Sequence, residues 1–388
     1  EREFYVNDAG SQVAKLGASI RARARGEEVP EDGYQGDYVT ELAQRIPGAA
    51  DKDADELARL GVELMLERNR ATMETYRVHF DTWFSERTLY DGDPTPVERA
   101  YEQLEAQGHL YRSEGALWLR TTDTGDDKDR VLQRSSGEPT YFASDIAYHA
   151  DKLARGNDRL INVLGADHHG YVRRMQAAIA ASGEDPERFE APIMQLVHVV
   201  EGGQRAQMSK RKGEFVTLDE LVDDIGVDAA RWFLVQRSHD TTIDLDLDLA
   251  RTQSSDNPVY YVQYAHARIA SILRKAETDL GWKPSPESAQ AAAEAGIDTA
   301  AEPAEREIVK RLLSAPGEVA AAAELRAPHR LCAFATDTAA DFHAFYRDCQ
   351  VVGVGGELEQ ARLALCVATK SVIASTLGLL GVGAPERM

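Results

Sequence analysis

The chain has 388 residues, of which 43% are hydrophobic and 28% are charged, and its formal net charge is −21. These proportions are ordinary for a soluble globular protein of two or three domains. The sequence contains no uninterrupted run of about 18 apolar residues, so it predicts no membrane span. The acidic charge argues against nonspecific binding to nucleic acid or anionic membranes, but it allows selective contacts through local basic patches.

The three cysteines, Cys332, Cys349 and Cys366, are few, odd in number and far apart. Such spacing fits neither a disulfide framework nor a zinc cluster, and it is typical of a reducing cytosol. The N-terminal residues lack a methionine and open on charged side chains, so they predict neither a signal peptide nor a natural start. We therefore expect a cytoplasmic protein that is truncated at its N-terminal end.

The first two-thirds of the chain alternate strand-like and helix-like segments. Apolar runs that end at glycine or at loop-forming residues predict strands at residues 3–6, 159–165 and 193–203. Between them, residues 55–76 and 170–183 have the pattern of helices. Alternation of this kind indicates an open α/β sheet with covering helices.

The rest of the chain predicts only helices. Asn257 can cap a helix over residues 257–277, and Pro258 would occupy its first position. The Ala-, Glu- and Pro-rich residues 283–305 indicate a connector or a solvated helix, and the remainder indicates amphipathic helices of a bundle. We therefore expect a domain boundary near residues 240–256.

A basic cluster, Lys210, Arg211 and Lys212, interrupts this acidic chain. Thr217 and Glu220 behind it form a capping box, so the cluster lies on a loop between the end of a strand and the start of a helix. Lysine and backbone N–H groups on such a loop can meet phosphate oxygens. The alternative is a solvated turn, the usual role of a charge run.

The sequence LGADHHG, residues 164–170, follows a predicted strand at the edge where α/β sheets bind ligands. Gly165 would let the backbone approach a nucleotide, and the Asp167 carboxylate could accept hydrogen bonds from ribose hydroxyls. The alternative for His168 and His169 is a polar turn. A zinc site is disfavoured because no cysteine or carboxylate partner stands at ligand spacing.

In YFASDIAYH, residues 141–149, Tyr141 and Asp145 are four positions apart and would share one face of a helix. A guanidinium needs a planar, ionised acceptor with an aromatic face or hydroxyl beside it, and these two side chains provide both. The alternative is a helix that carries a single surface aspartate.

Several segments resemble a known family. Residues 207–211, QMSKR, resemble the second signature of class I aminoacyl-tRNA synthetases, KMSKS or KMSKR, with Gln207 in place of the first lysine. The Tyr-x-x-x-Asp-Ile pattern at Tyr141 and Asp145 resembles that of arginyl-tRNA synthetases. Further blocks resemble successive parts of a bacterial-type arginyl-tRNA synthetase: REFYVNDAG, DGYQGDYVTELA, FDTWFSE, GADHHGY, VDAARWFLVQRS, NPVYYVQYAHAR, FYRDCQVV and APERM.

The resemblance implies an arginine–tRNA ligase, which activates L-arginine with ATP to arginyl-adenylate and transfers it to tRNA(Arg). It assigns catalysis to Lys210 and Ser209, on the loop that stabilises the pyrophosphate leaving group. The residues implied for ATP binding are Gly165, Asp167, Gln207, Met208, Ser209, Lys210 and Arg211. Those implied for arginine binding are Asn7, Tyr141, Asp145 and His168. Those implied for tRNA binding are Tyr261, Arg268, Tyr346 and Met388.

The resemblance also implies a Rossmann-like α/β catalytic domain with a parallel sheet over residues 1–248, N-terminally truncated and with an insertion at about 85–140. An all-α helical bundle that binds the anticodon would follow over residues 249–388. The first class I signature, His-x-Gly-His, is absent from the sequence. If the molecule begins at Glu1, half of the ATP site is missing and we expect this chain alone to be nearly inert. The alternative is that the sequence is a portion of a longer molecule.

By the same resemblance, ATP acts with Mg²⁺, zinc is not used and the protein is a monomer. The lack of a long apolar run predicts no membrane partner. One alternative is a noncatalytic tRNA-binding or regulatory relative. Another is a synthetase for a different amino acid such as cysteine, which would need zinc ligands that the scattered cysteines do not supply. Asp244, Asp246 and Asp248 predict an extended segment with alternating faces rather than a calcium loop, because leucines intervene and no suitable glycine or glutamate follows.

Overall fold

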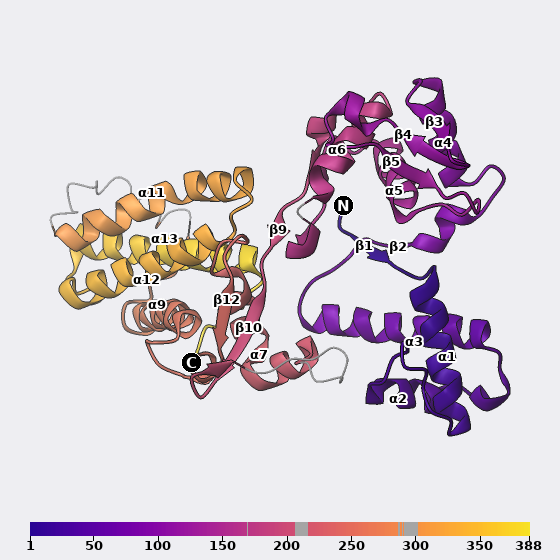
Figure 1. Cartoon of the computed structure of the whole chain (residues 1–388). Helices are drawn as coiled ribbons and strands as arrows, with labels where there is room; N and C mark the ends of the chain where they lie inside the picture. The colour runs from indigo at the N-terminus through magenta and orange to yellow at the C-terminus, as the bar shows by residue number, and fades with distance from the viewer. Residues whose placement is uncertain (169, 206–215, 286–287, 289, 291–301) are drawn as a thin grey trace. The chain divides into compact units, whose positions relative to one another are not determined.

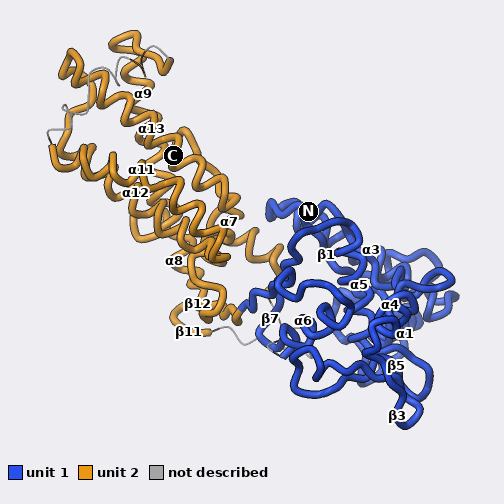
Figure 2. The backbone as a smooth tube through the Cα atoms, turned by 90° about the horizontal axis from the view of Figure 1, so that it is seen from above, with its two compact units in different colours: residues 1–194, 207–215 blue, residues 195–206, 216–388 orange. Residues whose placement is uncertain are grey.

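The computed structural model describes residues 1–168, 170–205, 216–285, 288, 290 and 302–388. The chain forms two compact units. Unit 1 contains residues 1–194 and 207–215, and unit 2 contains residues 195–206 and 216–388 (Figure 2). Unit 1 mixes strands and helices, whereas unit 2 is mostly helical (Figure 1).

Unit 1 alternates short strands with helices. Its helices are α1 (Ser11–Arg25), α2 (Asp37–Arg45), α3 (Ala54–Thr75), α4 (Pro96–Ala106), α5 (Tyr141–Ala154) and α6 (Tyr171–Ala181). Its strands are β1 (Glu3–Val6), β2 (Thr82–Ser85), β3 (Leu110–Ser113), β4 (Ala116–Leu119), β5 (Arg130–Gln133), β6 (Leu160–Ile161), β7 (Leu164–Gly165), β8 (Phe189–Glu190) and β9 (Ile193–Met194). Short 3₁₀ helices connect them: η1 (Ala49–Asp51), η2 (Glu86–Tyr90), η3 (Thr121–Thr124), η4 (Ala166–His168) and η5 (Pro186–Arg188).

The strand pairing confirms the predicted parallel α/β arrangement. β1 pairs with β2, β6 with β8, and β7 with β9, all in parallel. The single strands predicted at residues 159–165 and 193–203 were wrong in extent: the first forms β6 and β7, and the second divides between β9 and a strand of unit 2. Each part pairs with a different strand, so neither apolar run forms one continuous strand. β3, β4 and β5 form a separate antiparallel sheet.

Helix α5 lies in the main core of unit 1 because one of its faces is apolar. Phe142, Ile146 and Ala147 are buried there together with side chains of α4, α6 and the strands β4 and β5. This packing fixes the orientation of α5. Tyr141 and Asp145, on the less buried face, are thereby held in a defined direction.

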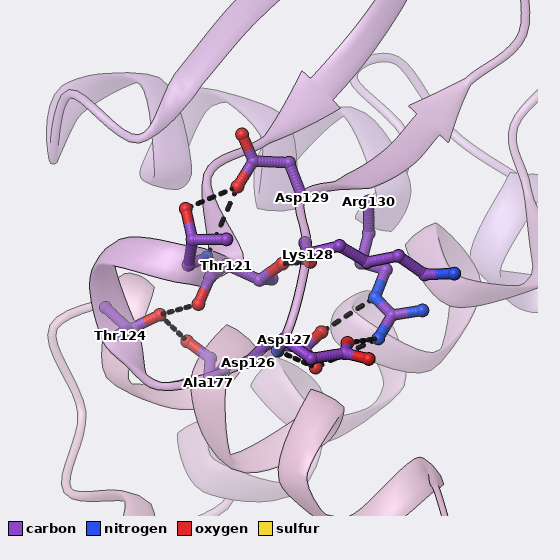
Figure 3. Close-up of polar contacts among 9 residues, drawn as sticks. Thr121, Thr124, Asp126, Asp127, Lys128, Asp129, Arg130 and Ala177 are labelled. Atoms are coloured by element: carbon purple, nitrogen blue, oxygen red, sulfur yellow. Dashed lines mark hydrogen bonds and ion pairs between the residues drawn. The ribbon is translucent and has the colours of Figure 1, made fainter.

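A polar loop between η3 and β5 contacts helix α6 (Figure 3). Arg130 donates from Nε to Asp126 Oδ2 at 2.7 Å and from Nη2 to Asp126 Oδ1 at 2.9 Å. Thr124 Oγ1 donates to the carbonyl oxygen of Ala177 at 2.8 Å. Burial works to raise the pKa of Asp126, but hydrogen bonds from Arg130 and the Asp127 N–H outweigh it and lower the pKa to about 2. The ion pair of the ionised Asp126 with Arg130 therefore fixes the conformation of this loop. We call residues 121–130 the brace, because Thr124 also bonds them to α6.

Unit 2 begins with a small sheet and continues with helices. Its strands are β10 (Val197–Glu201), β11 (Gln204–Arg205) and β12 (Ile243–Asp246), in the order β11-β10-β12 with β10 and β12 parallel. Its helices are α7 (Leu218–Val235), α8 (Leu247–Arg251), α9 (Pro258–Leu280), α11 (Pro303–Glu324), α12 (His329–Asp348) and α13 (Gly356–Leu380). The predicted succession of helices after the last strand is confirmed.

Local signals in the sequence set the helix starts of unit 2. Thr217 and Glu220 form the predicted capping box at the start of α7. The side chain of Asn257 accepts a hydrogen bond from the N–H of Val259 and caps α9, as predicted. These caps satisfy N–H groups that have no partner inside their own helix.

The acidic segment at residues 242–250 is extended only in its first half, strand β12. Asp246 then accepts a hydrogen bond from the N–H of Leu249 at 3.0 Å and starts helix α8. Among the described residues, no group of three or more His, Cys, Asp or Glu side chains is arranged to hold a metal ion.

Helix α13 is the one helix in the described part of the chain that is long and apolar enough to cross a membrane. Length and composition alone give this result, and the core helix of a soluble protein passes the same test. Leu363, Cys366, Ile373 and Leu377 are fully buried. They lie in a helix that packs against α9, α11 and α12, which accounts for its apolar composition.

Candidate functional site

The carboxyl ends of the parallel strands β1 and β2 lie side by side and continue into two polar loops. Asp8, in the loop after β1, accepts a hydrogen bond from Ser85 Oγ at 2.6 Å and from the N–H of Arg87 at 3.0 Å. Asp8 therefore ties the loop that carries the exposed Asn7 to the loop that begins at Glu86.

Helix α5 brings two predicted arginine ligands to these loops. Tyr141 stands at the start of α5 with 57% of its surface exposed. Its hydroxyl oxygen lies 3.7 Å from the point that a Cβ atom on Gly10 would occupy. Ser144, beside Asp145, shares a hydrogen bond of 2.6 Å with the hydroxyl of Tyr90. The first turn of α5 therefore lies against the loops that follow β1 and β2.

The Asp145 carboxylate is largely enclosed by groups from other elements. Burial, and then the nearby carboxylate of Glu86, raise the pKa of Asp145 to about 7. The charges of Arg174 and Lys152 and a hydrogen bond from the Tyr171 hydroxyl act in the opposite direction. A cation that binds here favours the ionised carboxylate, so the site is electrostatically suited to a positively charged ligand.

A second carboxylate, Glu86, was missed by the sequence analysis. It is 2% exposed, and its pKa is raised by burial and by Asp8, against hydrogen bonds from Tyr90 and Tyr5. Two such carboxylates beside aromatic hydroxyls match the planar, charged guanidinium group. The signal was present in the sequence, because an acidic residue directly follows the apolar strand at the edge where α/β sheets bind ligands.

The end of β7 and the following η4 carry three more predicted residues, Gly165, Asp167 and His168. The ring of His168 lies edge-on to that of Tyr171, with 6.0 Å between the ring centroids, and Tyr171 hydrogen-bonds to Asp145. One side chain therefore connects His168 with Asp145. Asp167 is exposed, and its Oδ1 lies 3.0 Å from the point that a Cβ atom on Gly165 would occupy. A side chain at position 165 would crowd this carboxylate.

A chain of polar side chains links α5 to the segment before β7. Lys152 Nζ donates to Asn162 Oδ1 at 2.8 Å, and Asn162 Nδ2 donates to His149 Nε2 at 2.8 Å. His149 Nδ1 donates to the carbonyl oxygen of Asp145 at 2.6 Å. Burial, together with Lys152, lowers the pKa of His149 to about 3, so its ring stays neutral. These bonds fix the helix that carries Asp145 relative to the segment that leads to Gly165.

The predicted phosphate-binding loop lies outside the described residues. This applies to all five of its candidate residues: Gln207, Met208, Ser209, Lys210 and Arg211. On either side of it, strand β11 ends at Arg205 and helix α7 begins at Leu218. These neighbours agree with the prediction of a loop between a strand and a helix.

In unit 2, α9 and α12 bring Arg268 against two tyrosines. The guanidinium carbon lies 4.7 Å from the ring centre of Tyr264 and 4.8 Å from that of Tyr346, a cation–π arrangement. These side chains and the C-terminal Met388 line a cavity of about 530 Å³. Three predicted tRNA contacts, Arg268, Tyr346 and Met388, therefore lie together.

The fourth predicted contact, Tyr261, lines a separate cavity of about 410 Å³ with Tyr264 and His343. The centres of the Tyr261 and His343 rings are 4.9 Å apart. Tyr264 was missed by the sequence analysis, although its spacing carries a signal. It stands three positions after Tyr261 and four before Arg268, so all three face one side of α9.

Two protein families match the chain. Residues 49–270 match the family described as tRNA synthetases class I (R), catalytic domain, and residues 262–388 match the DALR anticodon binding domain. The arginine–tRNA ligase of Moorella thermoacetica is 47% identical over 401 residues, which cover all of this chain and 70% of the relative. That of Frankia alni is 48% identical over 399 residues, which cover all of this chain and 71% of the relative.

Solved structures agree with these matches. A structure from Campylobacter jejuni assigned as an arginyl-tRNA synthetase has a TM-score of 0.87 and 32% identity, and the match covers all of this chain and 84% of that one. The arginyl-tRNA synthetase of Thermus thermophilus has a TM-score of 0.78 and 24% identity. This match covers all of this chain and 75% of that one, and it supports the fold. None of these relatives supports the alternative of a noncatalytic protein. The chain therefore belongs to the arginyl-tRNA synthetase family: it is a class I aminoacyl-tRNA ligase whose substrates are arginine, ATP and tRNA.

Proposed function

We propose that this ligase recognises the guanidinium group of L-arginine through Asp145 and Glu86 and forms arginyl-adenylate at the carboxyl edge of the strands of unit 1. In the reaction of the family, an arginine carboxylate oxygen attacks the α-phosphorus of ATP, and pyrophosphate leaves. A ribose hydroxyl at the 3′ end of tRNA(Arg) then attacks the carbonyl carbon, and AMP leaves. The residues that we assign to arginine are Asn7, Tyr141, Asp145, His168 and Glu86.

The observation that carries this proposal is the pair of largely buried carboxylates, one on α5 and one after β2. The charge of Glu86 raises the pKa of Asp145, the charge of Asp8 raises that of Glu86, and each carboxylate accepts a hydrogen bond from a tyrosine hydroxyl. A guanidinium stays charged in proteins and offers five N–H donors in a fixed plane. It can therefore place one positive charge between the two carboxylates and donate hydrogen bonds to both, whereas a neutral side chain would supply no charge.

The variant Asp145→Asn tests this assignment in the complete enzyme. The KM for arginine is expected to rise roughly a hundredfold, because removing one partner of a buried charge pair costs about 3 kcal/mol. The KM for ATP should change little, since the nucleotide is assigned to other residues. Steady-state aminoacylation at saturating tRNA measures both constants.

Asp151→Asn is the matched control on the same helix. Asp151 pairs with Arg155 at 3.1 Å, and 42% of its side chain is exposed. Its loss should leave the KM for arginine unchanged. The proposal fails if Asp145→Asn also leaves that constant unchanged, or if the two variants raise it equally.

For the nucleotide, we assign Gly165 and Asp167 to the ribose and the loop of residues 207–211 to the phosphates. On that loop, Lys210 and Ser209 would act on the leaving pyrophosphate, with Gln207, Met208 and Arg211 also holding ATP. Support comes from the end of β7, where 84% of the Asp167 side chain is exposed. Mg²⁺ would enter as part of the MgATP substrate, and no zinc is assigned a role.

For tRNA(Arg), we assign the anticodon to the surface of unit 2 formed by Tyr261, Arg268, Tyr346 and Met388. Aromatic rings and an arginine side chain are suited to stacking with unpaired bases. We retain residues 1–248 as the catalytic domain, with the insertion at about 85–140, and residues 249–388 as the anticodon-binding domain. A monomeric, cytoplasmic enzyme without a membrane partner completes the proposal.

A further inference from the structure

The last eight residues, Gly381 to Met388, follow helix α13 and form no helix or strand, although all of them are described. They end at the label C in Figure 1. Side chains from α7, α9 and α13 hold this tail at successive points along its backbone. The tail is therefore an ordered part of unit 2.

The first point of attachment is the backbone of Gly383. Its N–H donates to Asp228 Oδ1 at 3.0 Å, and its carbonyl oxygen accepts from Gln263 Nε2 at 2.9 Å. Gln263 Nε2 also donates to Asp228 Oδ2 at 2.8 Å. A Cβ atom at position 383 would lie 3.1 Å from Asp228 Oδ2, so glycine allows this close approach.

The second set of contacts holds the next residues. The buried His266, 2% exposed, donates from Nδ1 to the carbonyl oxygen of Pro385 at 2.8 Å. Arg274 donates to the carbonyl oxygen of Glu386 at 3.1 Å. The Glu386 carboxylate pairs with Lys370 at 2.6 Å, and the hydrogen bond from Lys370 lowers its pKa.

Beyond these contacts the tail enters the cavity that contains Arg268. Arg387 and Met388 line this cavity together with Tyr264 and Tyr346. The position of the last two residues is therefore set by bonds made several residues earlier. If the tail were loose, ordering it would oppose the binding of any ligand in this cavity.

We propose that Asp228, His266 and Lys370 are positioning residues for RNA binding. They clamp the tail, so that Arg387 and Met388 form one wall of the cavity before RNA binds. In this proposal the cavity receives an unstacked base and its phosphate. This proposal rests on the anticodon-binding function proposed above. The clamp residues act through the tail and need not touch the RNA.

The test uses Asp228→Asn, His266→Ala and Lys370→Gln in the complete enzyme. Two quantities are measured: the rate of amide hydrogen exchange in residues 381–388, followed by mass spectrometry, and the affinity for tRNA(Arg) in a direct binding assay. Exchange is expected to accelerate and tRNA binding to weaken, each roughly tenfold, because binding must then order the tail. The KM values for arginine and ATP at saturating tRNA should not change.

His266→Asn is a rescue variant, since an amide nitrogen can take the place of Nδ1 as donor to Pro385. It should restore both quantities toward the wild-type values and separates loss of the bond from loss of folding. Lys310→Gln is the matched control for Lys370→Gln. Lys310 pairs with Glu307 on the exposed surface of α11, and its loss should change neither quantity.

Three outcomes overturn the clamp: unchanged hydrogen exchange in residues 381–388, faster exchange with unchanged tRNA affinity, or equal changes in the KM values for arginine and ATP. The anticodon assignment is tested separately by Tyr346→Ala and by deletion of Met388. If these two variants bind tRNA normally, the proposed RNA surface itself is wrong. If they weaken binding while the clamp variants do not, only the positioning role is wrong.

Discussion

Asp145 is a carboxylate whose surroundings disfavour its own charge. Burial and the neighbouring Glu86 raise its pKa to about 7, so the protonated form is populated near neutrality before arginine binds. The guanidinium group of arginine stays charged over the whole physiological range. Binding of arginine through an ionised Asp145 must therefore release a proton when the pH is below that pKa.

Arginine affinity is accordingly expected to fall as the pH is lowered through 7. Below this pH the proton competes with the guanidinium, so the Kd for arginine should rise about tenfold per pH unit, whereas above it the Kd should be level. Calorimetric titration with arginine between about pH 6 and pH 8 measures this dependence. Asp145→Asn should flatten the curve, and a wild-type Kd that is constant over this range would contradict the assignment.

At the scale of elements, the loop between η3 and β5 shows how a buried charge braces one element against another (Figure 3). The side chains of Arg130 and Asp126 are only 15% and 4% exposed, so their ion pair is well shielded from water. Thr124 extends the same loop to the carbonyl oxygen of Ala177 on α6. The loop thus supports the helix that carries Tyr171.

Arg130→Met should lower the free energy of unfolding of unit 1 by about 3 kcal/mol at neutral pH, because it leaves a buried carboxylate unpaired. The folded-state pKa of Asp126 is depressed to about 2, so the stabilisation is present above its ordinary pKa and is lost as the pH falls toward 2. The difference between variant and wild type should therefore shrink in acid. Denaturant unfolding at several pH values measures it.

Arg134→Met is the control for this prediction. Arg134 and Glu138 form an exposed pair at 3.5 Å, with side chains 60% and 70% exposed. An exposed pair of this kind contributes between 0 and about 1 kcal/mol. Equal destabilisation by the two variants would contradict the role assigned to the brace.

At the scale of the whole molecule, charge is unevenly distributed. The net charge is −21, yet four cationic side chains line the cavity at the end of the tail. These are Arg268, Arg274, Lys275 and Arg387. Such a distribution favours RNA at one surface and opposes it elsewhere, which agrees with the selective binding expected from the composition.

The affinity for tRNA(Arg) is expected to decrease as the salt concentration increases. Arg268→Ala should reduce the slope of the logarithm of the association constant against the logarithm of the salt concentration by about 0.7, which is the value for one contact to a single-stranded phosphate. Fluorescence titrations at several salt concentrations measure the slope. Arg330→Ala is the control, since Arg330 pairs with Glu318 of α11 at 2.9 Å and does not line the cavity. An unchanged slope for Arg268→Ala would exclude a phosphate contact by this residue.

Features that depend on nearby residues followed from the sequence. The capping box of Thr217 and Glu220 starts α7 as predicted, and four positions of spacing place Tyr141 and Asp145 on one face of α5. The strand predicted at residues 193–203 was wrong as a single strand. Its two parts pair with β7 and with β12, and an apolar run carries no information about such distant partners.

The sequence by itself determined the alternation of strands and helices, the helix starts and the motifs that resemble the synthetase family. It also supplied the residue types that binding of arginine and ATP requires. Only the tertiary structure decided that Glu86 lies near Asp145 and that Asp228 holds Gly383, which is 155 positions away. The physical reason is that caps and helical faces are set within one or two turns of chain. Contacts between distant segments depend instead on how the whole chain packs, which local residue preferences do not specify.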